Sequence, residues 1–249
     1  MKAVILAGGK GTRLKPYTTV FPKPLMPIGD KPILEIVVQQ LKSHGFNEII
    51  MAVGHLAELI MTFFNDGSKY GIKIKYTRED KPLGTAGPLA LMKGELNETF
   101  LMMNGDLLTT LDYSDLVNYH KRNGAIATIA LNKRTVKIDF GVPEVDTDNN
   151  VIGYTEKPEI DYLVSMGVYV FEPRVLEYIR PNEYLDFPDL IKKLISNGET
   201  VKGYVYGGYW LDIGRPDDYE RANREIEEMK KFIRNCSRGK KDGMENPFV

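Results

Sequence analysis

The chain has 249 residues, of which 43% are hydrophobic and 27% charged, and its formal net charge is −1. This profile is typical of a soluble globular protein with room for one large α/β domain or two small ones. A charge so close to zero gives no general attraction for nucleic acid or an anionic membrane, so neither partner is expected. No apolar run is long enough for a transmembrane helix. The single cysteine, Cys236, excludes an intramolecular disulfide and favours a cytoplasmic location.

The first thirty residues carry the densest pattern in the chain. An apolar run over residues 3–7 predicts a strand buried on both faces, and it leads into a loop rich in glycines and cations. Glycines let backbone N–H groups approach an anion, while arginine and lysine supply charge to a polyphosphate. The candidate nucleotide-binding residues here are Leu6, Ala7, Gly8, Gly9, Gly11, Thr12, Arg13 and Lys23.

The spacing of these glycines matches neither the G-x-x-x-x-G-K-[ST] loop nor the dinucleotide fingerprint G-x-G-x-x-G. The loop continues instead into F-P-K-P-L-M-P, whose prolines exclude a helix interior or a central strand. They predict a stiff connector that returns Lys23 toward the glycines. From the residues alone, an ordinary strand-to-helix turn with charged neighbours is the alternative to a phosphate site.

Strands and helices then alternate through Asn123, which is typical of a mainly parallel sheet with helices on both faces. After Gly124 the pattern changes to strands joined by polar turns, which predicts a hairpin-rich, partly antiparallel region. The predicted helices cover residues 32–43, 56–64, 186–197 and 216–236. The predicted strands cover residues 48–53, 72–77, 99–104, 125–131, 140–145, 151–156, 164–171, 201–206 and 209–213.

These elements predict a doubly wound α/β fold with a mixed, mainly parallel, Rossmann-like sheet and a hairpin-rich subregion. No linker-like stretch divides the chain, so we expect one domain over residues 1–236. Its expected parts are a nucleotide-binding half, a hairpin-rich second half and a C-terminal helix, followed by a flexible tail. Their bounds are residues 1–123, 124–215, 216–236 and 237–249.

Two aspartates stand at the ends of apolar strands, Asp106 after Gly105 and Asp212 before Ile213. Ligands of open α/β sheets gather at the carboxyl ends of the strands, and Mg²⁺ is usually held by one or two carboxylates with phosphates and water. Taken alone, each aspartate could equally be a turn residue that accepts a local N–H.

The combination L-A-G-G-x-G-T-R-L-x-P-x-T, followed by P-K-P-L-x-P-I-x-x-K-P-I-L-E, resembles the sugar-1-phosphate nucleotidylyltransferases over roughly residues 1–225. The resemblance implies a Mg²⁺-dependent enzyme that joins a nucleoside triphosphate (NTP) to a sugar 1-phosphate and releases pyrophosphate. It implies catalytic roles for Arg13, Lys23, Asp106 and Asp212, with the two aspartates as metal ligands.

The later loop L-G-T-A-G-P-L-A looks like that of the mannose-1-phosphate guanylyltransferases rather than the thymidylyl branch, where a glutamine occupies it. The resemblance implies GTP and mannose 1-phosphate as substrates and GDP-mannose as product. It adds Leu83, Gly84, Thr85, Ala86 and Gly105 to the nucleotide site. A small Ala86 leaves room for a flat base, although the residues alone also fit a plain loop-to-helix start.

The resemblance makes residues 124–215 the sugar-phosphate half and assigns the sugar phosphate to Gly141, Glu156, Lys157 and Ser165. Gly141 would let a sugar ring lie against the backbone, Glu156 would accept sugar hydroxyls and Lys157 would pair with the phosphate. A solvated ion pair at a strand edge is the alternative for Glu156 and Lys157. Ser165 stands where many relatives have asparagine, so glucose or heptose 1-phosphate, with UTP or dTTP, stay open as substrates.

No Ser–His or Cys–His pair suggests a covalent nucleophile, which agrees with direct in-line attack by a sugar-phosphate oxygen. A regulatory subunit that senses nucleotide sugars is the non-enzyme alternative, and the presence of all four catalytic candidates disfavours it. A dinucleotide oxidoreductase is disfavoured by the missing third fingerprint glycine. The sequence leaves a homo-oligomer open.

Overall fold

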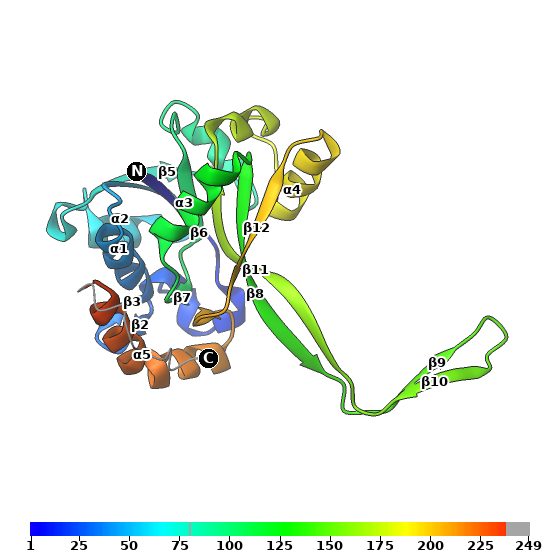
Figure 1. The fold of residues 1–249 in the computed structure, drawn as a ribbon. Helices are drawn as coiled ribbons and strands as arrows, with labels where there is room; N and C mark the ends of the chain where they lie inside the picture. Colours follow the sequence, from blue (N-terminus) through cyan, green and yellow to red (C-terminus); the bar gives the residue numbers. More distant parts are fainter. Residues whose placement is uncertain (80, 238–249) are drawn as a thin grey trace.

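The computed structural model describes residues 1–79 and 81–237, with side chains through Glu227. Its centre is a seven-stranded sheet in the order β12-β8-β11-β6-β1-β4-β5 (Figure 1). Neighbouring strands in this sheet are parallel except at β11, which runs antiparallel to both β6 and β8. The mixed, mainly parallel sheet is therefore confirmed. Its strands are β1 (Lys2–Ala7), β4 (Glu48–Val53), β5 (Lys73–Arg78), β6 (Phe100–Asn104), β8 (Ala127–Lys137), β11 (Glu159–Phe171) and β12 (Val201–Tyr206).

Helices cover both faces of this sheet. One core packs Ile5 and its neighbours against three helices, and another packs Val4 against a helix and two 3₁₀ segments. Successive side chains of a strand point to opposite faces, which is why β1 is apolar from Ala3 to Ala7. The first face carries α1 (Ile33–Ser43), α2 (Ala57–Phe64) and α3 (Tyr113–Asn123). The second carries α4 (Phe187–Ser196), η5 (Gly87–Met92) and η6 (Pro173–Tyr178).

A third core lies at the end of the sheet where the glycine-rich loop sits. There Leu14, Leu108 and Leu211 pack against α5 (Pro216–Ser237) through residues such as Ile226. Three small two-stranded sheets and four 3₁₀ turns complete the described structure. The small sheets pair β2 (Pro27–Ile28) with β3 (Lys31–Pro32), β7 (Leu107–Thr109) with β13 (Trp210–Asp212), and β9 (Val142–Val145) with β10 (Val151–Thr155). The turns are η1 (Thr12–Leu14), η2 (Tyr17–Thr19), η3 (Lys23–Leu25) and η4 (Ser68–Tyr70).

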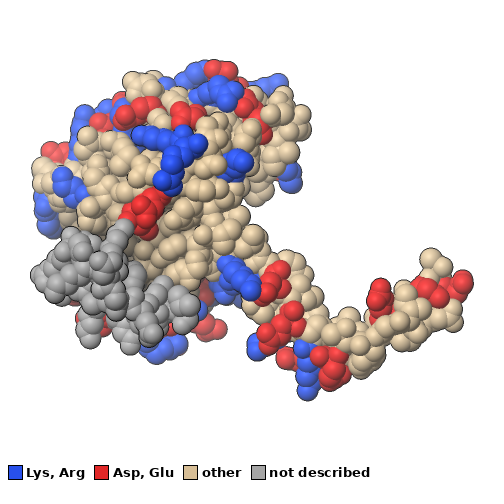
Figure 2. Space-filling model, viewed as in Figure 1, with Lys and Arg blue, Asp and Glu red and all other residues tan. Residues whose placement is uncertain are grey.

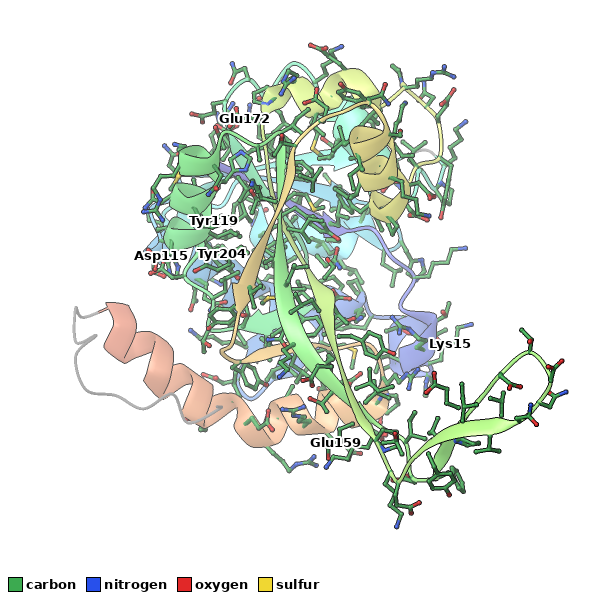
Figure 3. All side chains as sticks on the ribbon, turned by 45° about the vertical axis from the view of Figure 1, so that its right-hand side comes forward. Lys15, Asp115, Tyr119, Glu159, Glu172 and Tyr204 are labelled. Carbon is green, nitrogen blue, oxygen red and sulfur yellow. The ribbon has the colours of Figure 1, made fainter. Side chains whose placement is uncertain are left out.

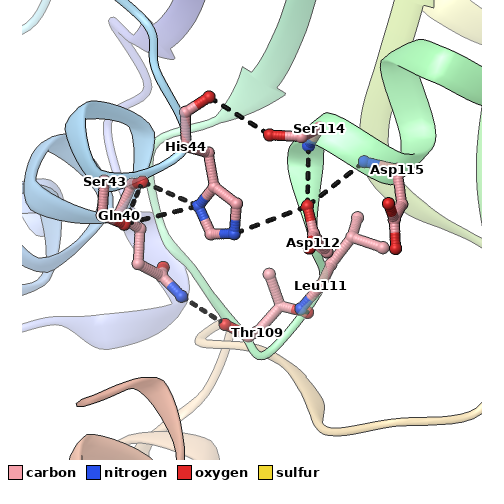
Figure 4. A network of polar contacts seen from close by, with 8 residues as sticks. All are labelled: Gln40, Ser43, His44, Thr109, Leu111, Asp112, Ser114 and Asp115. Carbon is pink, nitrogen blue, oxygen red and sulfur yellow. Dashed lines mark hydrogen bonds and ion pairs between the residues drawn. The ribbon is translucent and has the colours of Figure 1, made fainter. Parts of the chain in front are cut away.

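Polar contacts tie the C-terminal end of α1 to β7 and to the start of α3 (Figure 4). The buried side chain of Gln40 donates to the Thr109 carbonyl at 2.6 Å. His44 Nε2 lies 3.7 Å from the Asp112 carboxylate, which also accepts the N–H of Ser114 and so caps α3. β7 is therefore held at one end by this network and along its length by β13, which fixes the residues that precede it.

Strands β8 and β11 continue beyond the sheet as a two-stranded ribbon. In the described structure β8 pairs with β12 only as far as Asn132, and beyond that residue it pairs with β11 alone. We call residues 133–163 the arm; it comprises the outer part of this ribbon and the hairpin β9–β10. The arm projects from the body of the molecule (Figures 1 and 2). In Figure 3, Glu159 marks the ribbon, while Tyr119 and Tyr204 mark where α3 packs on β12, with ring centroids 5.2 Å apart.

Most predicted elements agree with the structure within a few residues, but the arm does not. The strands predicted over 125–131 and 164–171 are much longer, because β8 runs to Lys137 and β11 begins at Glu159. Their outer parts lie in solvent and lack the apolar composition of buried strands. Among the described residues, no helix is both long and apolar enough to cross a bilayer. The division into two halves stays a prediction, and of the predicted tail, residues 238–249 lie outside the described residues.

Candidate active site

Gly8, at the end of β1, lies against the backbone that follows β4. A Cβ on Gly8 would be 3.2 Å from the Gly54 nitrogen, and a Cβ on Gly54 would be 3.0 Å from the Gly8 oxygen. The His55 N–H donates to that oxygen at 3.1 Å. Beyond this contact the loop is open: Gly9 has free space around its Cα, and Gly11 adopts a positive φ of 59° that favours glycine. The result is an accessible glycine-rich surface at the carboxyl end of a central strand.

Lys23 returns to this loop, as the prolines around it predict. It begins η3 and is only 7% exposed, and its Cβ is 3.2 Å from the place where a Cβ on Gly11 would lie. Its ammonium group forms an ion pair with Asp106. A buried lysine is costly without a partner of opposite charge, so Asp106 stabilises the connector as well as the charge.

The two aspartates are held by adjacent strands. Gly105 donates its N–H to the Leu6 carbonyl at 2.9 Å, and a Cβ on Gly105 would be 2.9 Å from the same oxygen, so glycine is required there. Asp212 pairs with Leu107 across the β7–β13 ladder, and the Asp106 carbonyl accepts the N–H of Ile213, the residue directly after β13, at 3.1 Å. The structure thus brings together carboxylates that are more than a hundred residues apart in the chain.

The pKa of Asp212 reports this closeness. Burial raises the pKa of the Asp212 carboxyl, and the charge of Asp106 raises it further, whereas Lys23 and Arg13 lower it. Arg13 reaches the same place from η1, with its guanidinium packed over Gly214: a Cβ on Gly214 would be 3.1 Å from Nη1. All four catalytic candidates predicted from the sequence therefore lie at one site.

This donor set fits a magnesium ion shared with phosphates. No group of three or more acidic, histidine or cysteine side chains able to hold a metal occurs among the described residues. Mg²⁺ does not require one, because it usually takes one or two carboxylates together with phosphate oxygens and water. Burial is the main cause that raises the pKa of Asp212 and the charge of Asp106 is the next, and a divalent cation bound by both carboxylates would offset their repulsion.

The predicted base loop is held in place by the segment before α4. The Asp186 carboxylate accepts the N–H and the hydroxyl of Thr85 at 2.9 and 3.1 Å, and the Thr85 hydroxyl accepts the Phe187 N–H. A Cβ on Gly84 would be 2.6 Å from the Leu185 carbonyl oxygen. Ala86 is fully buried in the second core. The conformation of this loop thus depends on residues about a hundred positions later in the chain.

The predicted sugar-phosphate residues lie elsewhere. Gly141, Glu156 and Lys157 are on the arm, with Glu156 and Lys157 exposed to solvent. The Tyr154 hydroxyl lies over Gly141, so close that a Cβ on Gly141 would be 1.9 Å away, at the place where the resemblance predicts a sugar ring. Ser165 sits at the base of the arm, with its hydroxyl 2.9 Å from that of Tyr169. Within one copy of the chain, the structure does not bring the arm residues to the four charged residues.

Sequence reasoning missed several residues that shape the nucleotide side of the site. For the contact of Gly8 with Gly54 and His55, the sequence offers one signal, which is a glycine directly after the strand 48–53. Glu79 accepts the Leu83 N–H at 2.8 Å, and burial raises the pKa of the Glu79 carboxyl. Asp186 gives no local signal at all, because its partner Thr85 is distant in the chain.

Known proteins with related sequences include a UTP–glucose-1-phosphate uridylyltransferase from Synechocystis, 37% identical over 246 residues, with 91% of this chain and 63% of that protein covered. A mannose-1-phosphate guanylyltransferase from Mycobacterium tuberculosis is 33% identical over 230 residues, with 90% and 64% covered. The chain therefore spans somewhat less than two thirds of the length of these relatives.

Among solved structures, HddC from Yersinia pseudotuberculosis complexed with GMP-PN shares the fold, with a TM-score of 0.70 and 26% identity. That likeness covers 90% of this chain and 99% of the other. A model of the nucleotidyl transferase family matches residues 2–229, which include every element up to the first turns of α5. The chain belongs to the nucleotidyl transferase family.

Proposed function

We propose that this chain transfers a nucleotidyl group from a nucleoside triphosphate to a sugar 1-phosphate. The observation that carries the proposal is the convergence of Arg13, Lys23, Asp106 and Asp212 at the open glycine-rich loop. Two cations and a pair of carboxylates at the carboxyl ends of strands suit a triphosphate with a divalent metal. The family and both curated relatives support this reaction class.

In this reaction an oxygen of the sugar phosphate attacks the α-phosphorus in line with the bond to the β-phosphate. The new oxygen–phosphorus bond forms as the old one breaks, and pyrophosphate leaves with the electron pair. The attacking oxygen is already ionised at neutral pH, so no general base is needed. Bound Mg²⁺, held by Asp106 and Asp212, would neutralise phosphate charge. Arg13 and Lys23 hold the triphosphate and stabilise the charge that builds on pyrophosphate.

We propose GTP and mannose 1-phosphate as the substrates, which gives GDP-mannose. The sequence of the loop from Leu83 to Ala90, the M. tuberculosis relative and the nucleotide analogue in the HddC complex support a guanine nucleotide. The Synechocystis relative supports a second candidate, UTP with glucose 1-phosphate.

A substrate matrix tests both the reaction class and the pair. GTP, UTP and dTTP are each incubated with mannose, glucose or heptose 1-phosphate and Mg²⁺, and pyrophosphate release is measured. We expect GTP with mannose 1-phosphate to give the highest kcat/KM. A maximum at UTP with glucose 1-phosphate would replace the proposed pair, and no release with any pair would refute the reaction class.

A further inference from the structure

The arm presents an apolar face that the described structure leaves in water. The pairing of β8 with β11 sets Ile160 opposite Val136, and Tyr162 follows two residues later on the same face. These side chains are 38%, 48% and 52% exposed. The opposite face carries ion pairs, such as Lys133 with Asp161 at 2.8 Å, and the 55% exposed side chain of Leu163. Arg134 shares the first face, where its guanidinium lies 5.4 Å from the centroid of the Trp210 ring at the base of the arm. Beyond Arg134, the first face offers exposed apolar side chains to a partner.

The tip of the arm is also unsupported. Among the described residues, the hydrogen bonds of segment 138–158 join it only to itself, for example from Ile138 to Pro158. An isolated two-stranded hairpin is marginally stable in water. Exposed apolar surface of this extent marks a site of interaction. Its members at the tip are Phe140, Val142, Val145, Val151, Ile152 and Tyr154.

The arm also carries the residues that are predicted to bind the sugar phosphate. The sequence resemblance assigns the sugar phosphate to Glu156 and Lys157 on the arm, whereas the proposed function places the triphosphate at the body site around Asp106. The arm points away from its own body (Figures 1 and 2), so the two half-sites are apart within one copy. Completing the site therefore requires that an arm meet a body.

We propose that the arm of one copy of this chain docks on the body of a second copy and completes the active site there. This inference rests on the proposed function. Every copy carries an acceptor surface in the connector beside the phosphate loop, where Tyr17, Val20 and Phe21 are 61%, 75% and 41% exposed. A net charge of −1 per copy does not oppose association. Reciprocal exchange of one element between two copies is a low-cost route to a symmetric dimer with two complete sites.

Complementation between two defective variants tests the exchange. Asp106→Asn disables the body half-site and Lys157→Ala disables the arm half-site. The two chains are co-expressed with different affinity tags, and the mixed dimer is purified through both tags. One of its two sites then combines an intact body with an intact arm, so pyrophosphate release should recover to about half the wild-type rate per dimer. If each site used its own arm, the mixed dimer would only average the two defective rates, and the proposal would be wrong.

The matched control combines Asp106→Asn with Asp212→Asn. Both changes lie on the body, so no mixed dimer contains an intact body and the rate should stay at the level of the single variants. Recovery in this control would show that the preparation contains wild-type chain, and would overturn the interpretation.

Sedimentation separates failure of the arm proposal from failure of the proposed function, because it does not depend on turnover. The wild-type chain should sediment as a dimer at micromolar concentration, and Ile152→Asp on the arm should shift it to a monomer. Ile195→Asp is the control, since Ile195 on α4 is 59% exposed and Ile152 is 62% exposed. A monomeric wild type, or a dimer that both variants leave intact, would refute the arm exchange whether or not the chain is active.

Discussion

Asp212 is the residue at which stability and chemistry conflict most directly. Burial and the neighbouring Asp106 raise the pKa of its carboxyl above the ordinary value. At pH values between the ordinary pKa of the unfolded chain and the raised pKa of the folded protein, the folded protein binds the proton more tightly than the unfolded chain does. Stability therefore falls as the pH rises through that range, and the cost persists at every higher pH. At neutral pH the protein without metal carries this cost in full.

Replacing Asp212 by asparagine should therefore raise the melting temperature at pH 7 in the absence of metal. The gain should shrink as the pH falls toward the ordinary carboxyl pKa, because the wild-type side chain then takes up its proton. Calorimetry between pH 4 and 8 measures the difference. Asp106→Asn is the comparison with the opposite sign: it leaves the buried Lys23 without its ion-pair partner and should lower the melting temperature. A less stable Asp212→Asn variant at pH 7 would contradict the assigned electrostatics.

The same two variants should be nearly inactive. Loss of one electrostatic contact to the transition state costs on the order of a hundredfold in turnover, and each aspartate is proposed to hold Mg²⁺. Turnover with saturating Mg²⁺, GTP and sugar phosphate measures the loss, and circular dichroism checks that both variants remain folded. Near-normal turnover in either variant would remove that residue from the metal site.

Arg13 should act on the rate rather than on binding alone. The proposed contact of Arg13 with the phosphates would strengthen as charge moves to the leaving pyrophosphate, so Arg13→Ala should lower kcat and not merely raise KM for the nucleotide. Arg13→Lys should restore activity only in part, because a point charge cannot replace the planar guanidinium fork. Steady-state kinetics with varied GTP separate the two effects. A change confined to KM would exclude the transition-state role.

At the scale of elements, the contact between the loop 83–87 and the start of α4 fixes the conformation of the loop that is predicted to bind the base. The Tyr184 hydroxyl and then Thr85 hold the pKa of Asp186 below its ordinary value. A carboxylate with a lowered pKa stabilises the fold at pH values above its ordinary pKa. That contribution disappears as the pH falls through the lowered value.

Asp186→Asn should weaken the contact between this loop and α4, and so lower the free energy of unfolding at neutral pH. Hydrogen bonds to a charged group contribute about 1.5–3 kcal/mol, and the partial exposure of Asp186 favours the low end of that range. Chemical denaturation at pH 7 measures the loss, and the gap to wild type should narrow in acid. Asp189→Asn is a suitable control, because Asp189 lies on the same helix and makes a surface ion pair with Lys192. Equal losses of unfolding free energy in the two variants would show that the contact between Asp186 and Thr85 contributes no more stability than a surface ion pair.

The two halves of the chain differ in how far the sequence predicts them. The phosphate loop is local, and Gly11 and the prolines around Lys23 constrain its backbone directly, so residues alone indicate its shape. The buried strands are apolar on both faces, so the sequence predicts them equally well. The arm is different, because Val136 and Ile160 alternate with polar residues in a pattern typical of an exposed ribbon or of a half-buried strand. The Thr85–Asp186 contact joins distant segments and has no sequence signal.

At the scale of the whole molecule, the base and the sugar should be selected by separate parts. Thr85 belongs to the rigid loop on the body, whereas Glu156 lies on the arm. Glu156→Gln should weaken sugar-phosphate use about ten- to a hundredfold with every nucleotide, the scale of a lost hydrogen bond to a charged group. Thr85→Val should change the ratio of GTP to UTP use and leave the order of sugars alone.

The substrate matrix, run on both variants, measures these two selectivities. Ser165→Asn is the informative addition, since a changed sugar preference would assign that choice to the base of the arm. If Glu156→Gln reordered the nucleotides, or Thr85→Val reordered the sugars, the assignment of base and sugar to separate parts would fail.

The pairing of β7 with β13 has a consequence for the order in which the protein forms during synthesis. The strands β5, β4, β1 and β6 are adjacent in the sheet and all lie within the first 104 residues, so the phosphate loop and its parallel strands can assemble early. The strand that holds Asp212 leaves the ribosome more than a hundred residues after β7. The growing chain therefore acquires its glycine-rich loop first and its second carboxylate almost last. An incomplete chain that stops before β13 holds the Lys23–Asp106 pair but lacks the carboxylate opposite.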